Sequence, residues 1–217
     1  MRAALESLLR ARKLDVTLTA APGLEIAPPE RLAPTGHAEL DHALGGGLRR
    51  GHVSEITGAT SSGRSTIAVR AMAAAADRGE AVALIDTCDS FDPASAAARR
   101  LSLSRLLWIR ESGDASRALK AFSLVLQAGG FGLVVFDLAD VAPHALRRFP
   151  WTTWMRIARI VEGRDTAALL VGAERIARSA GGVTIALEST SPRWQGSSSR
   201  ARLFTGVEPA PRVVRAR

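Results

Sequence analysis

Hydrophobic and polar positions along this chain divide it into short apolar runs separated by longer segments with helical spacing. The run FGLVVFD at 131–137 is the clearest strand, because a continuous apolar stretch that ends in an acid is typical of a strand buried on both faces. Further strands are predicted at 52–57, 81–86, 106–110 and 167–172, and helices at 64–79, 93–101, 114–130 and 151–162. Repeated strand–helix units predict an α/β fold, with a mostly parallel sheet and helices on both faces.

The two ends of the chain depart from this pattern. Residues 1–33 are predicted to form an N-terminal helical arm, helical over about 2–13, and a Pro-rich linker, and 34–188 the core. Residues 189–217 are predicted to hold a polar loop at 189–200, two final extended pieces and a basic tail, with the extended strands at the C-terminal edge of the sheet. Leu5, Leu8 and Leu9 share one face of the arm helix, which suits a contact with a partner, with another copy or with the chain's own core.

The charge and composition of the chain indicate what kind of partner it could bind. The net charge is +8, and the basic residues are almost all arginine, since the only lysines are Lys13 and Lys120. This balance favours a polyanionic partner such as nucleic acid, or reflects a biased composition. The single cysteine, Cys88, excludes an internal disulfide, and no apolar run approaches the length of a membrane span, so a soluble cytoplasmic protein with no membrane partner is expected.

The stretch GATSSGRST at 58–66 is the main candidate for chemistry. It follows a predicted strand and precedes a predicted helix, as a phosphate-binding loop does, but Arg64 stands where that motif has lysine. The candidate nucleotide-binding residues are Gly58, Ser62, Gly63, Arg64, Ser65 and Thr66. Ser65 and Asp137, at the end of the apolar strand, are the candidate Mg²⁺ ligands. Because a guanidinium is wider than an ammonium group, binding of ATP and Mg²⁺ is expected to be weakened or lost.

Two stretches of the sequence resemble segments of a known protein family. The stretch PTGHAELDHALGGGLRRGHVSEITGATSSGRST at 34–66 resembles the entry to the ATPase core of RecA-family recombinases, and ALIDTCDSFDPASAAARRL at 83–101 resembles the segment that follows. The likeness continues through the next strands to about residue 188 and again through PRVVRAR. It implies a RecA-like P-loop NTPase core.

The departures from the family pattern point away from efficient hydrolysis. The resemblance places Cys88 where the family has the glutamate that positions the attacking water, and Glu174 near the place of the glutamine that links the γ-phosphate to the DNA loop. A thiol is a poor base for water, so only Asp86 or Asp89 remains to replace the glutamate. A degenerate ATPase site with no catalytic residue is therefore expected.

A second candidate surface lies at 143–159, where the resemblance places the family's first DNA loop. The segment interleaves arginines with aromatic rings, so that bases could stack while arginines neutralise phosphates, or the tryptophans pack on the core and the arginines are solvated. The candidate residues are Arg147, Arg148, Trp151, Trp154 and Arg156.

The degenerate site, the N-terminal helix and the arginine-rich tail together resemble ImuA-type accessory proteins of bacterial mutagenesis cassettes. That resemblance implies a non-hydrolysing scaffold in SOS-linked translesion synthesis, with a Y-family polymerase-like protein and an error-prone DNA polymerase as partners. Single-stranded DNA, another copy of the chain or RecA are further partners it allows. The alternatives are a DNA-dependent ATPase of the RecA/RadA type in recombination or repair, and a regulator that mimics a subunit of another protein.

Overall fold

The computed structural model describes residues 28–177, 182–198 and 200–214. The predicted arm helix, with Leu5, Leu8 and Leu9, lies outside these residues. The described chain opens with a short 3-10 turn, η1 (Pro29–Arg31), and a small antiparallel pair, β1 (Leu32–Ala33) with β2 (Leu48–Arg49). Helix α3 (Ala38–Leu44) lies between them and was not predicted from the sequence.

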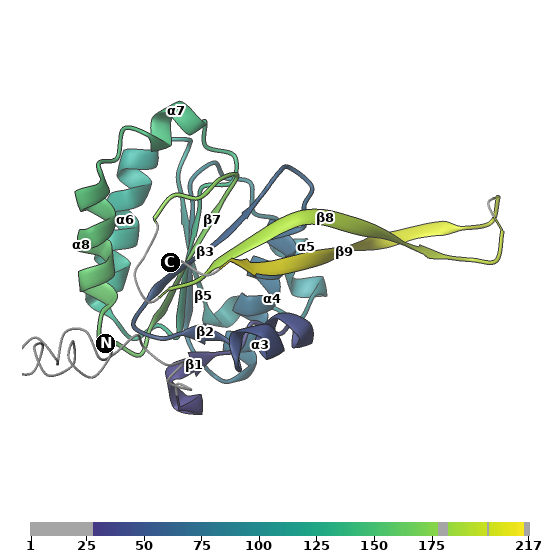
Figure 1. Cartoon of the computed structure of the whole chain (residues 1–217), viewed down its shortest axis with the longest axis horizontal. Coiled ribbons are helices and arrows are strands. Elements are labelled where there is room, and N and C mark those ends of the chain that lie inside the picture. The colour runs from purple at the N-terminus through teal and green to yellow at the C-terminus, as the bar shows by residue number, and fades with distance from the viewer. Residues whose placement is uncertain (1–27, 178–181, 199, 215–217) are drawn as a thin grey trace, which may run out of the picture.

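A seven-stranded sheet forms the centre of the molecule, in the order β5-β4-β6-β7-β3-β8-β9 (Figure 1). Its strands are β3 (Val53–Gly58), β4 (Val82–Asp86), β5 (Leu106–Arg110), β6 (Leu133–Asp137), β7 (Ala167–Gly172), β8 (Thr184–Gln195) and β9 (Leu203–Val214). All neighbouring strands are parallel except β9, which runs antiparallel to β8. The expected RecA-like α/β fold, with a mostly parallel sheet and extended strands at its C-terminal edge, is confirmed.

Helices cover both faces of the sheet, as Figure 1 shows. They are α4 (Arg64–Asp77), α5 (Pro93–Ala98), η2 (Leu103–Arg105), α6 (Ala115–Ala128), α7 (Pro143–Leu146) and α8 (Trp151–Val161). Because side chains alternate along a strand, β6 serves two cores: Val135 packs with α4, while Phe136 stacks on Phe122 of α6 at 4.8 Å between ring centroids. Asp114 caps the start of helix α6 as predicted, because its carboxylate accepts from the N–H groups of Ser116 and Arg117 in the first turn.

The C-terminal hairpin differs from the expectation for residues 189–200. The predicted polar loop is wrong over most of its length, because β8 continues to Gln195 and pairs with β9 along an antiparallel ladder. The two expected short pieces are one continuous strand, β9. Only the first part of β8 pairs with β3, so the outer half of the hairpin projects beyond the sheet (Figure 1). Residues 191–198 are exposed on both faces, and such a ribbon lacks the apolar alternation by which strands are predicted.

The carboxyl ends of the parallel strands meet at one edge of the sheet and position the candidate site. Asp86 of β4 lies in register with Asp137 of β6, and Thr57 of β3 with Gly172 of β7. In open α/β sheets this edge is where ligands bind. No helix in the described ranges is both long enough and apolar enough to cross a membrane.

Candidate functional site

The loop between β3 and α4 keeps the shape of a phosphate cradle. Ser61 and Gly63 both have left-handed backbone, with φ of 65° and 89°, and such turns bring successive N–H groups into a concave nest. The N–H groups of Gly63, Arg64, Ser65 and Thr66 donate to no acceptor in the described part of the chain. Ser62 is 7% exposed, and its hydroxyl also has no partner among those residues. These free donors fit an anion.

The guanidinium of Arg64 donates hydrogen bonds to acceptors within the protein. Arg64 is 5% exposed, and its Nη1 donates to the Gly58 carbonyl at 2.7 Å. Its Nη2 donates to the Ala139 carbonyl at 3.0 Å and to the Asp140 carboxylate at 3.3 Å. The guanidinium therefore joins the start of the loop to the turn that follows β6. A charge satisfied in this way fits the role of the phosphate-binding lysine poorly.

The two candidate metal ligands lie at one cavity. Ser65 and Asp137 both line a cavity of about 220 Å³ between α4, the end of β6 and the segment around α5. Burial raises the pKa of Asp137 to about 6, opposed by the Ala139 N–H that donates to its carboxylate and helped by the nearby Asp86. A bound cation would lower the pKa of Asp137 again, because it favours the ionised carboxylate. The placement of Ser65 and Asp137 at one cavity is therefore compatible with a metal ion, and metal binding stays a prediction.

The acids beside Cys88 are held by other groups. Asp86 is 1% exposed, and its carboxylate accepts from the N–H groups of Ser90 and Phe91 and from the indole of Trp108. These hydrogen bonds to the Asp86 carboxylate stabilise the turn after β4.

Asp89 forms a two-point ion pair with Arg110, with both contacts at 2.7 Å, and that hydrogen bonding lowers its pKa. Burial raises the pKa of the Cys88 thiol, and Asp140, Asp137 and Asp86 add to the effect, so the thiol stays protonated at neutral pH. Asp86, Asp89 and Cys88, the residues considered for the role of the family's glutamate, therefore provide no free general base in the described structure.

The last strand of the sheet packs against the loop. A Cβ added at Gly63 would lie 2.7 Å from the Pro209 Cβ of β9. The adjacent Glu208 forms ion pairs with Arg193 at 2.6 Å and with Arg70 of α4 at 3.6 Å. No local pattern in the sequence predicts this contact, because it joins residues far apart in the chain.

The arginine-aromatic segment divides between core and surface. Trp154 is 5% exposed and packs with Ile157 of α8 in the core, whereas Trp151 is 50% exposed. The four arginines of the segment, Arg147, Arg148, Arg156 and Arg159, are exposed. The alternatives of packing and binding therefore apply to different residues, and DNA contact through the exposed ones stays a prediction.

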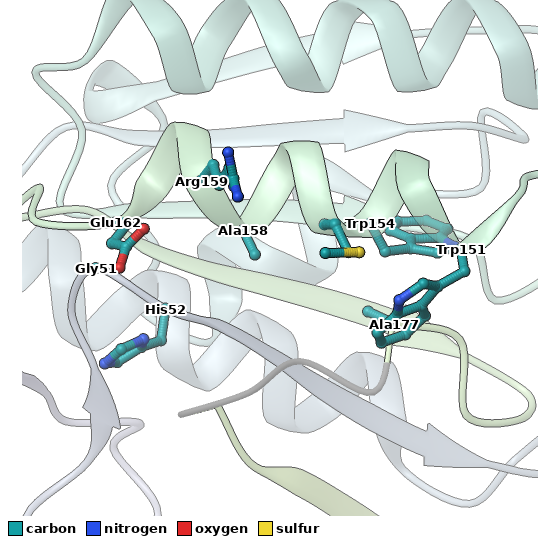
Figure 2. Close-up of a pocket in the computed structure, with 9 residues that line it drawn as sticks. Gly51, His52, Trp151, Trp154, Ala158, Arg159, Glu162 and Ala177 are labelled. Atoms are coloured by element: carbon teal, nitrogen blue, oxygen red, sulfur yellow. The ribbon is translucent and has the colours of Figure 1, made fainter. Parts of the chain in front are cut away.

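A groove of about 260 Å³ runs beside α8 (Figure 2). Trp151, Ala158 and Arg159 line it from α8, with His52 opposite and Ala177 near Trp151. Burial, together with Arg49, lowers the pKa of His52, so its ring is neutral at pH 7.

A residue that the sequence analysis did not single out holds the segment after β7. Glu55 lies on β3 and is 3% exposed. Its carboxylate accepts from the N–H groups of Ile176 and Ala177 at 2.8 and 3.0 Å, from the Arg175 guanidinium at 3.2 Å and from the Thr184 hydroxyl at 2.9 Å. An acid in the middle of an apolar strand is the signal that could have found it, because buried carboxylates require partners. Glu174, which precedes Arg175 in the chain, pairs with Arg147 of the candidate DNA surface at 3.8 Å.

Comparisons with known proteins agree with the fold of the chain. The family model for the RecA N-terminal domain matches residues 28–146. Protein RecA of Kineococcus radiotolerans is 38% identical over 125 residues, and that of Mycobacterium ulcerans 37% over 125 residues; each match covers 57% of this chain and 36% of the relative. The chain therefore spans about a third of the length of these curated relatives. The solved structure of the RadB recombinase superposes with a TM-score of 0.55 at 19% identity, covering 73% of this chain and 84% of that one.

Proposed function

Because the chain belongs to the RecA N-terminal domain family, we propose that it is a RecA-like accessory protein of DNA repair that does not turn over ATP. The observation that carries the proposal is the placement of Arg64, whose guanidinium is satisfied by Gly58, Ala139 and Asp140. A charge already paired inside the protein contributes little to a γ-phosphate that carries developing charge. The loop then serves as a structural joint between β3 and β6.

The contacts of the acids beside Cys88 support the same conclusion. Hydrolysis needs a group that accepts a proton from the attacking water, within hydrogen-bond reach of it. Asp86 and Asp89 are both occupied, and the raised pKa of Cys88 keeps its thiol protonated. Neither the guanidinium of the loop nor the acids of the turn after β4 is therefore free to support turnover.

Nucleotide binding without turnover is compatible with this proposal. The free N–H groups at 63–66 and the joint placement of Ser65 and Asp137 favour a residual site for phosphate and Mg²⁺. The same features support the second candidate, a DNA-dependent ATPase in which Arg64 leaves its present acceptors when ATP binds.

One experiment separates these two functions. Titration of Mg²⁺-ATP into the full chain by calorimetry measures binding, and phosphate release is followed in parallel with and without single-stranded DNA. We expect no DNA-stimulated turnover, whether or not nucleotide binds. Turnover that rises with DNA would overturn the accessory role and support the ATPase.

The variant Arg64→Lys tests which part of the loop limits binding. A lysine restores the motif but cannot reach all three acceptors of the guanidinium. Tighter ATP binding by this variant would show that the cradle is intact and that only the cation is wrong. Arg117→Lys is the matched control, because Arg117 is an exposed arginine that pairs with Glu111 far from the loop.

The cellular role we propose is that of an ImuA-type protein in SOS-linked translesion synthesis. Its partners would be a Y-family polymerase-like protein and an error-prone DNA polymerase, with single-stranded DNA as a further ligand of the exposed arginines around Trp151. The support is the resemblance together with the protein contacts that occupy Arg64, Asp86 and Asp89. Loss of the gene should lower damage-induced mutation while recombination is unchanged. The opposite pattern, with recombination lost and induced mutation normal, would contradict the role.

A further inference from the structure

The outer half of the β8–β9 hairpin carries an apolar cluster that nothing in the described chain covers. We define the hairpin tip as residues 191–198 and 200–206. Its large apolar side chains are exposed, Trp194 at 47%, Leu203 at 67% and Phe204 at 52%. Isolated exposed apolar residues are ordinary, but a cluster on a projecting ribbon marks an interaction site.

The cluster has a definite internal arrangement. Trp194 lies opposite Phe204 in the ladder, and their rings meet edge to face at 5.4 Å between centroids. The Arg202 guanidinium stacks on the Trp194 ring at 4.5 Å. Tryptophan and arginine side by side are typical of the residues that dominate binding energy at protein interfaces. The cross-strand pair also contributes to the pairing of β8 with β9 at the tip.

The charge of the hairpin tip favours one class of partner. Between residues 191 and 206 the chain has Arg193, Arg200 and Arg202 and no acidic residue. Glu208, at the base of the tip, pairs with Arg193, whereas Arg200 and Arg202 form no ion pair with any described residue. Two such tips would repel each other, which argues against a second copy, and the positive charge favours an acidic partner.

The backbone favours a polypeptide over a nucleic acid. β9 is the last strand of the sheet, so its outer edge has no strand beside it within the described residues. Near the domain this edge is protected by Pro209 and Pro211 and by the contact of Pro209 with Gly63. The segment Leu203 to Glu208 contains no proline, and its ladder with β8 is interrupted once, by the register shift between Phe204 and Gly206. An extended peptide can form backbone hydrogen bonds with such an edge, which a nucleic acid has no N–H and C=O ladder to do.

We propose that the hairpin tip is a docking site for an extended acidic segment of a partner protein. The segment adds a strand along Leu203–Glu208, packs apolar side chains on Trp194 and Phe204, and pairs carboxylates with Arg200 and Arg202. The inference is independent of the nucleotide chemistry of the loop, since the tip shares no residue with it. Failure of either proposal leaves the other in place.

Selection of short random peptides on the full chain tests this site. The enriched sequences are expected to alternate acidic and apolar residues. A synthetic peptide from the selection is then titrated against the unchanged chain and against variants. Trp194→Ser with Phe204→Ser should weaken binding by about tenfold or more, and Arg200→Ser with Arg202→Ser by about three- to tenfold. Leu124→Ser is the control and should bind as the unchanged chain does, because Leu124 is a 65% exposed apolar residue on α6, outside the hairpin tip.

Three results would overturn the proposal. The first is a selection that enriches no acidic-apolar peptide. The second is a selected peptide that binds the Trp194 and Phe204 variants as tightly as the unchanged chain. The third is a thymidine oligonucleotide whose binding depends on these tip residues while the peptides do not bind, which would make the tip a nucleic-acid site. Circular dichroism of each variant confirms that it is folded, which is expected because these side chains contribute nothing to the core.

Discussion

Replacement of Arg64 by alanine separates a structural role of the arginine from a ligand-binding role. The side chain is 5% exposed and donates to two carbonyl oxygens and one carboxylate. Removing a donor from a buried acceptor costs about 1–3 kcal/mol, while the half-exposed Asp140 regains water and loses less. We therefore expect Arg64→Ala to lower the free energy of unfolding by about 2–4 kcal/mol.

Urea denaturation followed by circular dichroism measures this loss without any ligand. For a chain of this length, about 3 kcal/mol corresponds to a melting temperature lower by roughly 6–12 °C. The control is Arg117→Ala, which removes an exposed arginine paired with Glu111 and should cost at most about 1 kcal/mol. An arginine held ready for phosphates would have no such structural cost. If Arg64→Ala is as mild as Arg117→Ala, the structural role is refuted.

Three further predictions concern other buried groups. Burial raises the pKa of Asp137 to about 6, so the folded state binds a proton more tightly than the unfolded state, and the free energy of unfolding falls as pH rises from about 4 to 6. Asp137→Asn should therefore stabilise the chain by about 1–3 kcal/mol at pH 7.5 but not at pH 4. Urea denaturation midpoints at the two pH values measure the difference. Glu55→Ala leaves four donors without their acceptor, so we expect the free energy of unfolding to fall by about 3–5 kcal/mol and trypsin to cleave faster after Arg175. Unchanged cleavage would contradict the role of Glu55 in holding this segment. Trp154→Ala should cost about 3–5 kcal/mol, and Trp151→Ala less than about 1 kcal/mol; equal losses in denaturation would contradict the division between core and surface.

The sequence predicts the central sheet well because its signals are local. The run at 131–137 is buried on both faces, so its apolar character is continuous, and the structure places β6 at Leu133–Asp137. The outer half of β8 gives no such signal. Its residues 191–195 face solvent on both sides, and its order comes from pairing with β9. Ladder pairing between exposed residues is not visible in a periodic pattern, so a polar loop was the natural expectation.

The candidate site is predictable in its parts but not in its connections. The glycines and Ser65 follow from the motif, and Asp137 follows from the strand that it ends. The direction taken by the Arg64 side chain does not, because its acceptors at Ala139 and Asp140 lie 75 and 76 residues along the chain. The same holds for Glu55, whose partners at 175–184 are joined to it only in the folded sheet.

The persistence of the loop motif has a physical explanation that needs no nucleotide. Gly63 has φ of 89° and lies against Pro209, so a larger residue would be strained and would push β9 away. At Gly58 a side chain would collide with Ser62, and the carbonyl of the same residue is an acceptor for Arg64. Each of these requirements comes from packing within the chain. A motif held by packing can keep its glycines after its lysine has changed, and so the glycines alone are weak evidence for ATP binding, whereas the acceptors of Arg64 bear directly on it.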